Sequence, residues 1–107
     1  MAVIAIYDSE SSHLEVLSTN LRQRGHVVVP LQEASLDELG HQALQTDILI
    51  VNFPKSNETM WDLLRHFCGL RRETGVPLPV LCCSKVYRGP RFELDIERLG
   101  ARLAYEE

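Results

Sequence analysis

Polar side chains follow three of the apolar runs in this sequence, and they are the first candidates for chemistry. Each stands where an apolar run of strand length stops. In a parallel sheet, ligands and chemistry lie just beyond the carboxyl ends of the strands. We therefore expect these side chains to share one edge of a sheet. In chain order they are Asp8, Ser9, Glu10, Asn52, Ser84 and Lys85.

The elements that must position these residues follow from the apolar patterning. Residues 48–51 are consecutively apolar, without polar alternation, which is typical of a parallel strand buried on both faces. We expect strands at residues 2–7, 27–29, 47–52, 80–83 and 101–105, with helices at 12–24, 35–44, 57–72 and 90–99. Alternating strands and helices with short connections predict an α/β fold, a parallel sheet covered by helices on both sides.

Local signals indicate where several elements begin or end. In a capping box, a Ser hydroxyl and a Glu carboxylate three residues later satisfy free amides of the first helical turn. The sequence holds two, Ser12 with Glu15 and Ser35 with Glu38, and Asn57 can cap a third helix. We further expect Pro30 to end the second strand and Pro90 to open the last helix.

Size and composition limit what the chain can be. Its 107 residues suffice for one hydrophobic core and are too few for two, so we expect residues 1–107 to form a single domain. The net charge of −4 argues against a general nucleic-acid binder. No run approaches the roughly 18 apolar residues of a membrane span, and the start lacks the basic region of a signal peptide. Three cysteines do not make a disulfide framework, so we expect a cytoplasmic protein.

In order and spacing, these features resemble the receiver domain of two-component response regulators over nearly the whole chain. The matching segments are residues 4–10, 24–27, 47–52, 60–64, 79–84 and 100–101. The resemblance implies a flavodoxin-like three-layer sandwich with a five-stranded parallel sheet in the order 2-1-3-4-5, the family's final helix being missing or truncated. It also implies a bacterial signalling role, as the N-terminal domain of a regulator or as a stand-alone adaptor.

The departures from the family pattern indicate that its chemistry is lost. Asn52 stands where an active receiver carries the aspartate that accepts the phosphoryl group. A neutral amide is a poor nucleophile, so we expect no phosphorylation there. The family's lysine on the fifth strand should fall near Glu106 or Glu107, where this chain has none, whereas Ser84 keeps the family's Ser/Thr switch position. We therefore interpret the chain as an atypical receiver, a pseudo-receiver that has no catalytic residue and is not an enzyme.

The resemblance also implies a depleted magnesium site. Mg²⁺ prefers octahedral oxygen ligation with one or two carboxylates. The remaining candidate ligands are Asp8, Glu10 and the side-chain carbonyl of Asn52, so we expect no resident cofactor and at most weak Mg²⁺ binding. Alternatively, Asp8 and Glu10 are polar residues favoured at a helix start, and Asn52 bonds to nearby backbone.

Basic and aromatic residues near the fourth helix form the candidate partner surface. Arginine offers bidentate contacts to phosphate or carboxylate, and the fourth-helix and fifth-strand surface is the usual output face of receivers. The candidate partner- or anion-binding residues are Lys85, Tyr87, Arg88, Arg91 and Tyr105, with a solvated loop as the alternative. We expect protein partners from a signalling pathway, and a homodimer through this face is compatible with a missing final helix. Trp61 would be an interface anchor if exposed and a core residue if buried.

Three other functions remain open. The domain could respond to a small ligand or an anion, or it could transfer phosphate at a non-standard residue such as Ser9 or Ser84. A thiol redox function would need a depressed pKa at Cys82 or Cys83. Because neighbouring strand residues point to opposite faces, we expect both cysteines to pack in the core instead. The four histidines lack ligand spacing, which argues against a zinc site.

Overall fold

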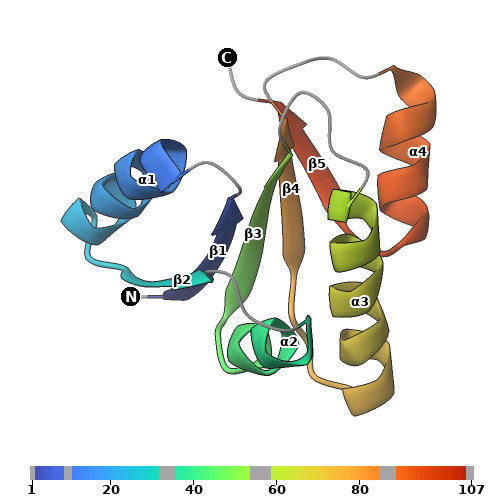
Figure 1. Cartoon of the computed structure of the whole chain (residues 1–107), viewed down its shortest axis with the longest axis horizontal. Helices are drawn as coiled ribbons and strands as arrows, with labels where there is room; N and C mark the ends of the chain where they lie inside the picture. The colour runs from blue at the N-terminus through green and yellow to red at the C-terminus, as the bar shows by residue number, and fades with distance from the viewer. Residues whose placement is uncertain (1, 9–10, 32–35, 54–58, 85–88, 106–107) are drawn as a thin grey trace.

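The computed structural model describes residues 2–8, 11–31, 36–53, 59–84 and 89–105, in which five strands and four helices alternate (Figure 1). The strands are β1 (Val3–Asp8), β2 (Val27–Leu31), β3 (Ile48–Phe53), β4 (Val80–Ser84) and β5 (Arg102–Tyr105). The helices are α1 (Ser11–Gln23), α2 (Leu36–Leu44), α3 (Thr59–Thr74) and α4 (Pro90–Arg98). Among these described helices, none combines the length and the apolar character that crossing a membrane requires.

All five strands form one parallel sheet in the order β2-β1-β3-β4-β5. Strand β1 is an interior strand, because Ile6 lies opposite Pro30 of β2 on one side and Ile50 of β3 on the other. The carboxyl ends of β1, β3 and β4 consequently meet at the same edge of the sheet. This arrangement confirms the predicted fold class and strand order.

Two apolar clusters cover the two faces of the sheet and give the molecule three layers (Figure 1). Side chains that alternate along β3 show how: Leu49 and Val51 belong to the larger cluster, and Ile50 belongs to the smaller one. The larger cluster lies under α2, α3 and α4. The smaller cluster lies under α1, where Leu14 is buried.

Two element boundaries differ from the sequence prediction. Strand β2 does not end at Pro30 but continues to Leu31, because β2 is an edge strand and a proline there removes no ladder bond that the sheet needs. Helix α1 begins at Ser11, so Ser12 lies inside the first turn and the predicted Ser12–Glu15 capping box is wrong. Pro90 does open α4, as predicted. Ser35 and Asn57, the other expected caps, lie outside the described residues.

Two close contacts fix how α3 packs against its neighbours. Gly40 is buried on α2, and a Cβ atom at this position would overlap Cδ1 of Leu70 on α3. At the other end, the half-buried Arg71 donates from Nη1 to the carbonyl of Leu78 at 3.1 Å and from Nη2 to the carbonyl of Leu99 at 3.5 Å. Arg71 therefore joins α3 both to the segment before β4 and to the end of α4.

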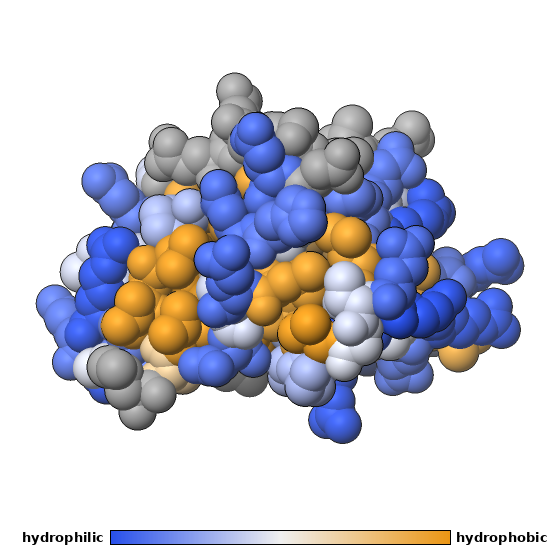
Figure 2. Space-filling model, turned by 90° about the horizontal axis from the view of Figure 1, so that it is seen from below, coloured by the Kyte–Doolittle hydropathy of each residue, from blue (hydrophilic) through white to orange (hydrophobic). Residues whose placement is uncertain are grey.

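The apolar surface is divided rather than continuous on the face seen from below. Figure 2 shows apolar patches there, separated by hydrophilic side chains. In the described part of the chain, the exposed large hydrophobic residues are Val16, Val27 and Leu94. They come from three different elements, α1, β2 and α4.

Candidate functional site

A hydrogen bond between two neighbouring strands forms the centre of the predicted site. Asp8 ends β1 and lies in register with Asn52 of β3. The Nδ2 atom of Asn52 donates to Oδ2 of Asp8 at 2.8 Å. Asn52 is 5% exposed and Asp8 is half-buried, so this bond lies largely out of water. The register of the parallel strands is what brings these two side chains together.

The chemistry of the two groups fixes the orientation of the Asn52 amide. An ionised carboxylate only accepts hydrogen bonds, so the amide nitrogen must face Asp8 and Oδ1 must face away. This Oδ1 atom is buried, and it has no hydrogen-bond partner among the described residues. The Asp8–Asn52 pair carries one negative charge, whereas two carboxylates at this distance would repel each other.

This pair fits a magnesium ion poorly. The Asn52 N–H group already occupies a carboxylate oxygen of Asp8, and the amide oxygen points away from that carboxylate. Mg²⁺ would therefore need the amide to turn over before both oxygens could face one ion. Glu10, the third candidate ligand, lies outside the described residues. Within the described ranges, no group of three or more His, Cys, Asp or Glu side chains could hold a metal.

Ser84 lies at the end of β4, in register with Phe53 of β3 and Tyr105 of β5. It is fully buried, so its hydroxyl is closed to a phosphate donor from solution. Its neighbour Cys83, not Ser84, is in register with Asn52.

The predicted partner surface is described only in part. Arg91 is exposed in the first turn of α4. Tyr105 belongs to β5, but its side chain lies outside the described part of the structure. Lys85, Tyr87 and Arg88 also lie outside it. The role of these five residues stays a prediction.

Cys82 packs in the core as expected and does not have the properties of a redox thiol, whereas Cys83 is only half-buried. Cys82 and Cys83 point to opposite sides of the sheet, where Cys82 joins the larger apolar cluster and Cys83 packs against the smaller one. Burial, with Cys68 and Cys83 nearby, raises the pKa of Cys82 to about 12. Burial also raises the pKa of Cys68. A reactive cysteine needs a lowered pKa, so the structure argues against a redox function at Cys82.

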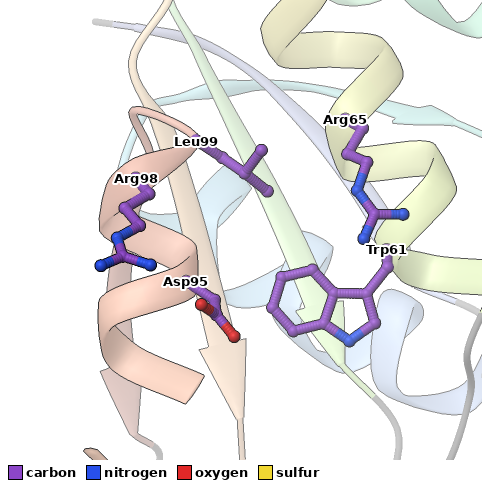
Figure 3. Close-up of a pocket in the computed structure, with 5 residues that line it drawn as sticks. All are labelled: Trp61, Arg65, Asp95, Arg98 and Leu99. Atoms are coloured by element: carbon purple, nitrogen blue, oxygen red, sulfur yellow. The ribbon is translucent and has the colours of Figure 1, made fainter. Parts of the chain in front are cut away.

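A pocket between α3 and α4 contains residues that sequence reasoning did not select. Its volume is about 450 Å³, and it is lined by Trp61, Arg65, Asp95, Arg98 and Leu99 (Figure 3). Trp61 is half-buried and packs against the larger cluster. It is therefore neither the fully exposed interface anchor nor the fully buried core residue that the sequence analysis considered. The spacing of Trp61 and Arg65, four residues apart, shows that they share a helix face. Nothing in the sequence shows that this face meets α4.

The fold is that of the CheY-like receiver domains. A putative pilus assembly-related protein from Burkholderia pseudomallei K96243 matches with a TM-score of 0.76 and 17% identity, over 98% of this chain and 78% of its own. The CheY-like protein tadZ from Pseudomonas aeruginosa PAO1 matches with a TM-score of 0.71 and 24% identity, over 98% and 87%.

A third solved structure shows this fold with ligands bound. It is the receiver domain of the histidine kinase CKI1 from Arabidopsis thaliana, complexed with Mg²⁺ and BeF₃⁻. It matches with a TM-score of 0.74 and 13% identity, over 97% of this chain and 80% of its own. No protein-family model and no curated protein matches the sequence. The solved structures therefore confirm the predicted receiver fold, and at these identities they show the fold alone.

Proposed function

We propose that residues 1–107 act as one receiver-like module of bacterial signal transduction that works through protein–protein contact and without aspartate phosphorylation. The hydrogen bond from Asn52 to Asp8 is the observation that carries this proposal. It occupies the carboxylate that would otherwise help to hold a cation, and it presents a neutral amide where a nucleophile is needed. On this proposal the module is a cytoplasmic binding protein and not an enzyme.

The same hydrogen bond gives the module one resting state. In this pair the Asn52 amide joins the carboxyl ends of β1 and β3, and the pair holds one carboxylate where two would repel each other. The strength of the signal would then depend on how much of the protein or of its partner is present, and not on phosphorylation. Mg²⁺ would bind weakly at most, through Asp8, Glu10 and the Asn52 carbonyl.

The partner would bind at the end of the sheet near α4 and β5, where Arg91 is exposed. Its guanidinium group offers bidentate contacts to a carboxylate or a phosphate. The Burkholderia neighbour is described as related to pilus assembly, which makes components of such an assembly the first partners to test.

An NMR titration tests the loss of phosphorelay chemistry. Backbone amides of Asp8, Asn52 and Ser84 are followed while Mg²⁺ and then beryllofluoride are added at millimolar concentrations. We expect these amides to stay in place and no beryllofluoride adduct to form. The Asn52→Asp variant, titrated in parallel, is the matched control, because it restores a carboxylate and should respond. An adduct on the native protein would overturn the proposal.

A further inference from the structure

The pocket between α3 and α4 has an apolar floor beside charged walls. Trp61 forms the floor, and its indole packs edge-to-face on Phe92, with ring centroids 5.3 Å apart at 70°. Leu99 points into the pocket beside the indole (Figure 3). The volume of about 450 Å³ falls within the range of small-molecule sites.

Two opposite charges on α4 are left without partners at this pocket. Asp95 and Arg98 stand one helical turn apart, a spacing at which a carboxylate and a guanidinium commonly pair. In the described part of the chain, neither side chain forms a hydrogen bond or an ion pair. The Asp95 carboxylate points toward the indole of Trp61 instead (Figure 3), and Asp95 is half-buried.

Arg65, on the opposite wall, differs from these two residues because it is already engaged. Its Nη1 atom lies 3.2 Å from Oδ1 of Asp62, and its guanidinium carbon lies 6.0 Å from the centroid of the Trp61 ring. The cation of Arg65 is thus offset by Asp62 on its own helix. Of the two unpaired charges on α4, the Asp95 carboxylate is turned toward the indole, whereas Arg98 is exposed and must swing its guanidinium group toward the pocket to reach a ligand there (Figure 3).

We propose that this pocket binds an α-amino acid with an apolar side chain. Such a ligand carries an ammonium and a carboxylate on the same carbon, which matches a carboxylate and a guanidinium one helical turn apart. Asp95 would accept hydrogen bonds from the ammonium group, and Arg98 would donate to the carboxylate. The apolar side chain would lie on Trp61 and Leu99. This site is independent of the partner-binding function proposed above.

The ligand can be tested with a single intrinsic probe, because Trp61 is the one tryptophan of the chain. Trp61 fluorescence and its indole N–H signal in NMR are followed during titration with L-leucine. Isopentylamine, which lacks the carboxylate, and N-acetyl-L-leucine, which lacks the ammonium, are the matched ligands. We expect a saturable change with leucine, and binding weaker by about tenfold or more for each of the other two.

Variants of the native chain test the assigned residues. Asp95→Asn and Arg98→Gln should each weaken leucine binding by about tenfold or more. Glu97→Gln, on an exposed α4 residue outside the pocket lining, is the matched control and should bind as the native protein does. Circular dichroism confirms that each variant is folded.

Three results would overturn the inference: no saturable change with leucine, isopentylamine binding as tightly as leucine, or Asp95→Asn binding unchanged. The beryllofluoride titration monitors a different pair of residues, Asp8 and Asn52. Failure of the amino-acid site therefore does not contradict the proposed function, and failure of the proposed function does not contradict the amino-acid site.

Discussion

The Asn52→Asp substitution would turn the hydrogen-bonded pair at the end of β1 and β3 into two facing carboxylates. In the native protein, Nδ2 of Asn52 donates to Oδ2 of Asp8 at 2.8 Å. A hydrogen bond to a charged group contributes about 1.5–3 kcal/mol to the free energy of unfolding. The substitution removes this contribution and adds a repulsion between like charges.

The size of that repulsion follows from the separation of the two groups. Two unit charges about 4 Å apart repel by about 4 kcal/mol at an effective dielectric constant of 20. Protonation of one carboxyl group limits this penalty. We therefore expect the variant to lose about 3–5 kcal/mol of unfolding free energy at neutral pH without divalent cations. A domain of this kind typically has about 5–15 kcal/mol, so the variant should remain folded.

Mg²⁺ should restore much of the lost unfolding free energy, because this ion prefers one or two carboxylates together with water molecules as ligands. A ligand that binds only the folded state stabilises it by about 2.7 kcal/mol at a concentration one hundred times its dissociation constant. The native protein, with the Asn52 amide on Asp8, should show no comparable gain.

Urea unfolding in EDTA and in millimolar Mg²⁺ measures both effects. Asn52→Leu is the matched control, since it removes the hydrogen bond, adds no charge and should unfold at the same urea concentration with or without Mg²⁺. The reasoning fails if Asn52→Asp is as stable as the native protein in EDTA. It also fails if Mg²⁺ stabilises the native protein as much as the variant.

Three further substitutions test the packing. Gly40→Ala should change the melting temperature little, because Cδ1 of the half-buried Leu70 can turn away from the new Cβ and the helix-propensity gain of about 1 kcal/mol offsets the remaining crowding; a large fall would contradict this. Arg71→Met keeps the apolar stem but loses two hydrogen bonds to backbone carbonyls. Urea unfolding should therefore show an unfolding free energy lower by about 2–4 kcal/mol, and an unchanged unfolding midpoint would refute this. The buried Cys82 thiol has a pKa of about 12 against an ordinary value of 9.0, so it stays neutral when folded and ionises when unfolded. Unfolding free energy should then fall by about 1.4 kcal/mol per pH unit as the pH rises through this interval, and Cys82→Ala should show a shallower fall; parallel curves would exclude this cause.

The fold could be predicted from the sequence because the pattern of apolar and polar residues along the chain determines the order of strands and helices. The uninterrupted apolar run of β3 and the capping signals of α4 each predicted their element, and alternation of strands and helices predicted the parallel sheet. Pro30 was misjudged because its effect depends on strand position: in a central strand it would break the ladder, whereas β2 lies at the edge.

For the candidate site, the sequence predicted which residues stand at the ends of the strands, but not how their side chains contact one another. That Asp8 and Asn52 would meet followed from parallel pairing, but the direction of the Asn52 amide is a property of the folded contact. The pocket beside Trp61 was not predicted, since it depends on how α3 crosses α4. No periodicity within one helix contains that information.

Arg71 has a consequence for the pocket as well as for stability. Its guanidinium group holds the carbonyls of Leu78 and Leu99, and Leu99 also lines the space between α3 and α4. Arg71 thereby ties the segment that follows α4 to α3, beside the pocket. A molecule that enters does not have to order the helices around itself, which removes a major entropic penalty of association. For the amino acid proposed above, affinity would then depend mainly on the chemistry of the pocket walls.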